Sequence, residues 1–179
     1  MRIAVSGTHG VGKSTLIDAF LRRHPEFIHE PEPYTVMVEA LGEEFSAEPS
    51  VEDFRRQLDF NIERLSQHTP GENVIYERCP VDFLAYVHAL DRKGAEALLE
   101  RVSDAMQHLD LIVYLPLDER TGEPESPKLQ RAVDHRLSSI FRDDEFGITS
   151  STNAIVVEAQ GPTDHRLRTL EKLTNFLIR

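Results

Sequence analysis

The sequence contains one cysteine, no tryptophan and only four lysines among its 179 residues. With Cys79 alone, an internal disulfide and a zinc site built from several cysteines are both excluded. No run of 18 apolar residues occurs, so we expect no transmembrane helix and no membrane partner. The apolar stretch after Met1 is too short for a signal peptide, and these absences together predict a cytoplasmic protein.

An excess of positive charge is also missing. Asp and Glu number 31 against 20 Lys and Arg, which gives a formal net charge of −11 at pH 7. Proteins that bind nucleic acids obtain most of their affinity by neutralising phosphates, and they need a positive surface to do so. We therefore expect no nucleic-acid partner, although a few local positive groups are enough to hold a small anionic ligand.

The chain has enough apolar residues, 40% of the total, to build one domain with its own core. Short apolar runs alternate along it with amphipathic helical patterns, and no linker or second core is evident. The expected strands are residues 2–6, 27–30, 74–77, 111–115 and 154–158. The expected helices are residues 14–24, a segment that ends near Gly42, 50–68, 80–90, 94–109, 129–141 and 163–178.

This alternation predicts a single three-layer α/β domain over residues 1–179, with a five-stranded parallel sheet flanked by helices. Right-handed crossovers place the carboxyl ends of all strands on one edge of such a sheet. Ligands bind at that edge, so the residues that follow each strand are the first candidates for a functional site.

The stretch "GTHGVGKST", residues 7–15, follows the first expected strand and opens the first expected helix. Gly7, Gly12, Lys13 and Ser14 match the pattern G-x-x-x-x-G-K-[ST], which a chain of this composition contains by chance about once in a thousand cases. Glycines let backbone N–H groups surround a phosphate, the lysine bridges the β- and γ-phosphates, and the serine hydroxyl ligates Mg²⁺. The sequence therefore predicts a P-loop NTPase fold that binds a nucleoside triphosphate and Mg²⁺. The expected contacts are Gly7, His9, Gly10, Val11, Gly12, Lys13, Ser14 and Thr15.

The base of the nucleotide is predicted only by default. No Asn is followed by Lys, so the N-K-x-D motif of GTP-binding switch proteins is absent, and we expect ATP. The segment "DRKG", residues 91–94, resembles the D-x-x-G of such proteins. It follows a helical pattern rather than a strand, and we interpret it as the end of that helix with a glycine stop.

Charged residues follow the second and third expected strands. Glu30, with Glu32 nearby, is the candidate for the carboxylate that orients an attacking hydroxyl, the alternative being a solvated acidic turn. Glu77 either holds Mg²⁺ through water beside Ser14 or acts as the base itself. Arg78 is the candidate clamp for a phosphate or a substrate anion.

Residues 118–142 combine an acidic loop rich in Pro and Gly with a basic helix, and we expect this segment to be a lid. Its basic residues include Arg120, Lys128, Arg131, His135 and Arg136. Arg131 and Arg136 are expected to close over the γ-phosphate and to exclude water. They lie about 140° apart on a helix, so they do not share one narrow face, and which of them contacts phosphate stays open.

Three stretches together resemble P-loop kinases of the deoxynucleoside-kinase kind: the glycine loop, "EP" at residues 30–31 and "ERCP" at residues 77–80. The resemblance implies that Glu30 supplies the base, that Arg78 binds phosphate or substrate, and that an arginine-rich lid covers the triphosphate. The sequence departs from that family at Cys79, where the family has serine, and in its lid, which has fewer arginines.

Over nearly its whole length the sequence is also similar to bacterial AAA-type P-loop ATP-binding proteins that resemble the nicotinamide riboside kinase domain. The shared stretches are "GTHGVGKST", "EP", "ERCPVDFLAY" and a late "GPTDHR". In related kinases the loop after the fifth strand lies against adenine, so the resemblance implies that Gly161 and Pro162 form that wall. An ordinary strand-to-helix turn is the alternative.

The predicted activity is transfer of the ATP γ-phosphoryl group to a hydroxyl of an unidentified small molecule, such as a nucleoside or related metabolite. An ATPase with a regulatory or conformational role, with water as the acceptor, is the main alternative. A nucleotide sensor without turnover is a third. The sequence leaves open the identity of the acceptor and the choice between a monomer and a homodimer.

Overall fold

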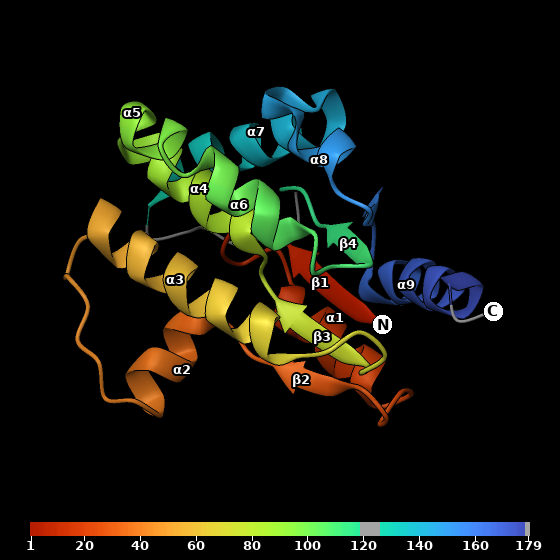
Figure 1. The fold of residues 1–179 in the computed structure, drawn as a ribbon. Coiled ribbons are helices and arrows are strands. Elements are labelled where there is room, and N and C mark those ends of the chain that lie inside the picture. The colour runs from red at the N-terminus through yellow and green to blue at the C-terminus, as the bar shows by residue number, and fades with distance from the viewer. Residues whose placement is uncertain (119–125, 178–179) are drawn as a thin grey trace.

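The computed structural model describes residues 1–118 and 126–177 of the chain. Five strands form one parallel sheet in the spatial order β2-β3-β1-β4-β5 (Figure 1). At its centre, Ala4 of β1 pairs with Tyr76 of β3 and Ile112 of β4. The expected five-stranded parallel sheet is confirmed, with every strand within one residue of its predicted bounds. The strands are β1 Arg2–Ser6, β2 Ile28–Glu30, β3 Val74–Glu77, β4 Leu111–Tyr114 and β5 Ile155–Glu158.

Helices cover both faces of the sheet, as the alternation of side chains along its strands requires. Ile3 and Val5 of β1 pack with α1 and α9, whereas Ala4 between them packs with α3, α4 and α7. Figure 1 shows α3, α4 and α6 together on one side of the sheet. The helices are α1 Lys13–Leu21, α2 Pro33–Glu39, α3 Val51–Gln67, α4 Pro80–Leu90, α5 Arg92–Glu96, α6 Leu99–Met106, α7 Pro127–Asp143, α8 Ile148–Ser151 and α9 Thr163–Leu177, with a 3₁₀ turn, η1, at Glu145–Gly147. None of the helices in the described ranges has the length and apolar character needed to span a bilayer.

Two details differ from the sequence prediction around α5. The single helix expected over residues 94–109 is divided into α5 and α6. Gly94, interpreted above as a stop, lies inside α5, while α4 ends at Leu90 before the extended residue Asp91. A Cβ atom at Gly94 would lie 2.1 Å from Asp91 Oδ2. A glycine is therefore needed here because a larger residue would collide with the Asp91 side chain.

Beyond α7 the chain makes a further turn and a short helix that the sequence analysis did not predict. Asp144 ends α7 in the left-handed conformation, with φ of 53°. Its carboxylate accepts the N–H groups of Thr149 at 2.8 Å and Ser150 at 3.1 Å, which caps α8. The missed elements therefore depend on one local carboxylate rather than on an apolar pattern.

Candidate active site

The loop between β1 and α1 is curled by three glycines. Gly7, Gly10 and Gly12 have φ values of 145°, 80° and 91°, a region that other residues rarely adopt. Gly12 is the N-cap of α1, and no side chain caps that helix. The N–H groups of the first turn of α1 therefore point out of the helix without a side-chain acceptor, which is the arrangement that binds phosphate in other proteins.

Lys13 is folded into this loop. Its side chain is almost entirely buried, and Nζ donates a hydrogen bond to the carbonyl oxygen of Thr8 at 2.9 Å. Burial lowers the pKa of Lys13 to about 8, with a smaller contribution from the nearby Arg78 guanidinium. A buried ammonium group whose bonded partner is a neutral carbonyl favours an incoming anion, so the loop residues fit the phosphates of a nucleotide.

A hydroxyl and a carboxylate meet where the loop enters α1. Ser14 Oγ donates to Glu77 Oε1 at 2.8 Å, and Glu77 ends β3 in a buried position. Hydroxyl and carboxylate oxygens are ligands that Mg²⁺ accepts, directly or through water. Within the described residues no group of three or more His, Cys, Asp or Glu could hold a metal ion. The pair therefore fits Mg²⁺ only in combination with phosphate oxygens and water.

Arg78 and Glu32 form an ion pair beside the loop, in which Arg78 is buried and Glu32 is partly exposed. Arg78 is a non-glycine residue with a positive φ of 75°, and its Nε donates to the Glu32 carboxylate. Its Nη1 donates to the carbonyl oxygen of Gly7 at 3.1 Å, and its guanidinium lies 5.3 Å from the ring centroid of Tyr86. Burial raises the pKa of Glu32, but Arg78 and Lys13 outweigh it and lower that pKa to about 2. The Glu32 carboxylate thus stays charged at neutral pH.

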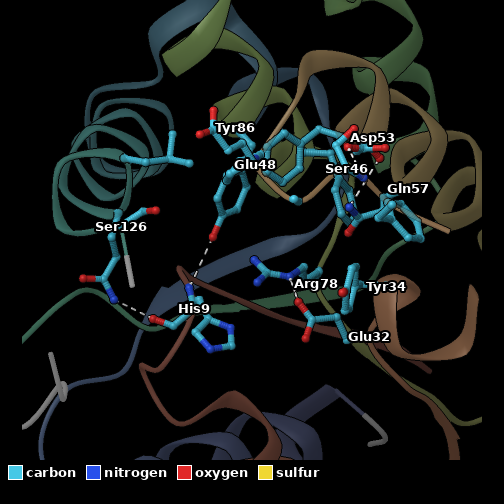
Figure 2. Close-up of a pocket in the computed structure, with 17 residues that line it drawn as sticks. His9, Glu32, Tyr34, Ser46, Glu48, Asp53, Gln57, Arg78, Tyr86 and Ser126 are labelled. Atoms are coloured by element: carbon cyan, nitrogen blue, oxygen red, sulfur yellow. Dashed lines mark hydrogen bonds and ion pairs between the residues drawn. The ribbon is translucent and has the colours of Figure 1, made fainter. Parts of the chain in front are cut away.

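A cavity of about 560 Å³ opens next to this ion pair (Figure 2). Phe54 and Tyr86 stack on its inner side with ring centroids 4.5 Å apart, and Gln57 and Asp53 add polar groups. The remaining lining residues are His9, Glu32, Tyr34, Phe45, Ser46, Ala47, Glu48, Pro49, Arg78, Phe83, Ser126, Leu129 and Gln130. Five of the 17 lining residues are Phe or Tyr, so we refer to it as the aromatic cavity, and the ion pair lies at one end of it.

His9 connects this aromatic cavity to the phosphate-binding loop. The His9 backbone N–H donates to the hydroxyl of Tyr86 at 3.3 Å, and Gln130 Nε2 of α7 donates to the His9 carbonyl at 2.7 Å. Figure 2 shows the His9 contact to Tyr86 and the Arg78 contact to Glu32 within the same site. The loop is thus fixed by α4 and by α7 at the mouth of the cavity.

A second cavity of about 350 Å³ borders the loop where it meets α9. Gly161 and Pro162 line it together with Gly10, Val11, Gly12, Thr15, Asp118, Thr163 and Arg166. Arg166 is 7% exposed, and it donates from Nη1 to the carbonyl of Val11 at 2.6 Å and from Nη2 to Asp118 at 3.0 Å. The segment that the resemblance assigned to adenine therefore lies against the phosphate-binding loop.

The structure directs Glu30 away from both cavities. Its carboxylate pairs with Arg64 on α3 and with Nε2 of His68, the C-cap residue of that helix, at 2.7 Å. The register explains this, because Glu30 pairs with Tyr76 and shares its face of the sheet, whereas the next residue of β3, Glu77, faces α1. Glu32, two residues later, lines the aromatic cavity and pairs with Arg78 instead.

A second signal in the sequence pointed to Glu32. It also forms a glutamate-proline pair, because Pro33 follows it as the first residue of α2. Sequence analysis named the first such pair because it directly follows β2. The chain turns between the two glutamates, and no periodic pattern reveals that turn.

The structure does not bring the two expected lid arginines to either cavity. Arg136 forms an ion pair with Glu145 and lies 5.8 Å from the ring centroid of Phe146, while Arg131 is exposed on α7. Neither belongs to the residues that line the cavities. Arg120 and residues 119–125 of the expected lid lie outside the described residues. Arg166, from the quoted "GPTDHR", is the buried arginine at the nucleotide side of the loop, and sequence analysis did not single it out.

Comparison with known proteins agrees with this architecture. A family model described as an AAA domain matches residues 2–152, whereas a search of curated protein sequences finds no match. Deoxyadenosine kinase from M. mycoides with bound dATP superposes with a TM-score of 0.65 and 15% identity, over 98% of this chain and 100% of that chain.

Two further solved structures have the same fold. NadR protein in complex with NR has a TM-score of 0.67 and 17% identity, over 96% of this chain and 49% of that chain. Thymidylate kinase from Candida albicans has a TM-score of 0.65 and 16% identity, over 98% and 91%. At such identities the likeness establishes the fold. It confirms the resemblance to P-loop kinases that the sequence motifs predicted.

Proposed function

The chain belongs to the family that the AAA domain model describes, and from that membership we propose that it transfers the γ-phosphoryl group of ATP to a hydroxyl of a small molecule. One observation supports this most strongly. The ion pair of Arg78 and Glu32 lies between the loop that contains Lys13 and an aromatic cavity large enough for an acceptor. An enzyme that only hydrolyses ATP has no need of an aromatic cavity next to its phosphate-binding loop.

In this proposal the loop holds the triphosphate. Lys13 and the backbone N–H groups from Gly10 to Thr15 bind the β- and γ-phosphates, and Ser14 and Glu77 hold Mg²⁺. Mg²⁺ bound there neutralises charge that develops on the phosphate oxygens. Adenine lies in the second cavity against Gly161 and Pro162, where Arg166 fixes the loop.

Glu32 takes the role that the sequence gave to Glu30. Its carboxylate accepts a hydrogen bond from the acceptor hydroxyl and orients one lone pair of that oxygen toward the γ-phosphorus. A pKa of about 2 makes Glu32 a weak base, and this is sufficient because phosphoryl transfer has a loose transition state with late proton loss. Arg78 holds Glu32 in place and presents its positive charge to the transferring group.

The acceptor that fits this cavity is a nucleoside or a related ring compound without its own phosphate. The stacked rings of Phe54 and Tyr86 suit a planar ring. Arg78 is the only Lys or Arg among the described lining residues, and Glu32 already pairs with it. Glu48 and Asp53 add negative charge, which disfavours an anionic acceptor.

The domain organisation belongs to the same proposal. Residues 1–179 act as one kinase-like domain, and residues 118–142 act as its lid, although 119–125 lie outside the described part of the chain. The described part of that segment reaches the site through Gln130, which holds the His9 carbonyl. Arg131 remains the lid residue with an exposed guanidinium, free of the ion pair that holds Arg136.

The test is a panel of nucleosides and their 5′-monophosphates, assayed for ADP release with ATP and Mg²⁺, with Lys13→Ala as the blank. We expect at least one unphosphorylated compound to raise ADP release tenfold or more above the rate without acceptor. Slow release that no acceptor changes would favour the ATPase instead. Tight ATP binding without any release would favour the nucleotide sensor.

A further inference from the structure

Asp82, the third residue of α4, carries a fully buried carboxylate that joins two distant segments of the chain. Oδ1 accepts the backbone N–H of Gly7 at 2.9 Å. Oδ2 accepts the backbone N–H of Cys79 at 2.9 Å and lies 3.3 Å from Cys79 Sγ. Its side chain has no exposure to solvent. One buried charge is therefore shared between the phosphate-binding loop and the turn that follows β3.

The helix that carries Asp82 accounts for only half of these contacts. Cys79 and Asp82 form a capping box, in which each side chain satisfies the backbone N–H of the other residue. A capping box needs no contact outside its own helix. The bond from Gly7 comes from 75 residues earlier in the chain, so it is additional to what α4 requires.

Gly7 is held from two directions. Asp82 binds its N–H, and Arg78 Nη1 binds its carbonyl oxygen at 3.1 Å. Its φ is 145°, and a Cβ atom there would lie 2.5 Å from the carbonyl oxygen of Leu115. The two side chains and the chain after β4 thus fix the orientation of the first peptide groups of the loop.

Arg78 depends on the same carboxylate. It sits in a left-handed backbone conformation that costs a non-glycine residue energy, and its Nη1 lies 3.7 Å from Asp82 Oδ1. Its backbone N–H donates to the carbonyl of Val5 at 2.9 Å. The charge of Asp82 therefore stabilises both the guanidinium and the turn that carries it.

We propose that Asp82 is a positioning residue of the phosphate-transfer site, which sets the direction of the loop N–H groups and the place of Arg78 through one buried carboxylate. An amide in its place keeps one acceptor oxygen but sets an NH2 group against the other backbone donor, and it removes the negative charge that faces Arg78. Loops that bind phosphate tolerate displacements of only a fraction of an ångström. The effect on ATP binding does not depend on the proposed function, whereas the effect on turnover rests on it.

The experiment compares Asp82→Asn with Asp144→Asn. Asp144 is a matched control, since its carboxylate also accepts two backbone N–H groups but lies at α8, outside both cavities. For each variant, thermal unfolding, the Kd of Mg·ATP by calorimetry and the kcat with the best acceptor are measured. We expect Asp82→Asn to raise the Kd about tenfold and to lower kcat about a hundredfold. Asp144→Asn should change both less than twofold, with a smaller loss of Tm because its carboxylate is not buried.

Equal Kd and kcat for wild type and a folded Asp82→Asn would overturn the inference. If wild type itself fails to bind Mg·ATP, the proposed function fails instead, and the two failures are thus distinguishable. Should the variant not fold, hydrogen exchange in the wild type decides. The Gly7 amide should exchange at least a hundred times more slowly than in an unstructured chain. Exchange at the unstructured rate would overturn the inference that Asp82 holds this amide.

Discussion

The turn after β3 and the helix α7 both carry arginines near the same edge of the sheet, and they use them differently. In the turn, Arg78 is 4% exposed and is committed to Glu32 and to the Gly7 carbonyl. On α7, Arg136 pairs with Glu145 in the neighbouring η1 turn, and Arg131 is exposed. The difference shows that a position near this edge of the sheet is not enough to make a charged residue part of the site. A charged side chain belongs to the site only where local backbone geometry aims it there.

The same contrast holds for the two glutamates after β2. Glu30 stabilises α3 by pairing with Arg64 and His68, whereas Glu32 faces Arg78 and the aromatic cavity. The two are separated by one proline, yet they lie in different environments. The contacts of Glu30 fit a role in fold stability, whereas those of Glu32 fit the part in phosphoryl transfer that we propose for it.

The largest expected effect separates these glutamates. Glu32→Gln should lower kcat by about a hundredfold to a thousandfold, because the acceptor hydroxyl loses its orienting carboxylate. Glu30→Gln should change kcat less than threefold but lower the free energy of unfolding by about 3 kcal/mol, since it leaves the buried Arg64 without its carboxylate. Steady-state kinetics and urea unfolding of both variants measure this. An equal loss of kcat in Glu32→Gln and Glu30→Gln would contradict the different roles proposed for these glutamates.

The arginines give the next contrast. Arg78→Gln should lower kcat about a hundredfold, because Glu32 and Gly7 both lose their partner. Arg136→Gln should lower the free energy of unfolding by about 1 kcal/mol and change kcat less than threefold. Kinetics with saturating ATP and acceptor provide the measurement. A large kinetic loss for Arg136→Gln would mean that α7 changes position during turnover and brings this arginine to the phosphates.

A smaller effect comes from pH. The pKa of Lys13 is lowered to about 8 in the free protein, and bound phosphate raises it by favouring the ammonium form. ATP affinity should therefore be constant below pH 8 and fall as pH rises above 8, by up to tenfold per unit. Glu32, with a pKa of about 2, contributes no change in this range. Calorimetry from pH 6.5 to 9.5 tests this, with Lys13→Met as the control whose weak affinity should not depend on pH.

Fold stability should respond to the same lysine in the opposite direction. The unfolded chain has the ordinary lysine pKa near 10.5, so between pH 8 and 10.5 it binds more protons than the folded protein. The contribution of Lys13 to stability therefore rises with pH across that window. Lys13→Met should remove this rise, which urea unfolding at pH 7.5 and 9.5 would reveal.

The smallest effect concerns Gln130, an α7 side chain that reaches the loop. Gln130→Ala removes the hydrogen bond to the His9 carbonyl and should raise the KM for the acceptor about threefold, with kcat nearly unchanged. Leu129→Ala, at the adjacent lining position, is the comparison that alters packing without touching this bond. If Gln130→Ala instead lowers kcat strongly, α7 contributes more to catalysis than its arginines suggest.

Sequence patterns predicted the features that depend on residues close together in the chain. The strands are short apolar runs, and the loop from Gly7 to Ser14 has a fixed spacing, so both were correctly located. Arg78 and Glu77 follow directly from the end of β3. The assignment of Gly161 and Pro162 to the adenine wall came from resemblance and stays a prediction; the structure places both beside the loop.

The remaining features depend on tertiary contacts that no local pattern encodes. Glu30 pairs with Arg64 and Glu32 with Arg78 because the chain turns at Pro31. Arg136 is paired with Glu145 in a turn that the sequence analysis missed. Asp82 is explained locally as part of a capping box, and only the folded chain reveals its bond to Gly7. Residues 45–49, which wall the aromatic cavity, have no periodic pattern at all.

The central place of β1 has a consequence for how this protein can change. Strands β2 and β3 lie on one flank of β1, and the segments that line the acceptor cavity come mostly from residues 32–86. Strands β4 and β5 lie on the other flank, and Asp118, Gly161, Pro162, Thr163 and Arg166 line the second cavity together with the loop. A single contiguous stretch of the chain thus supplies most of the aromatic cavity. Under the proposed function, recombination within that stretch would exchange the acceptor preference and leave the triphosphate site unaltered.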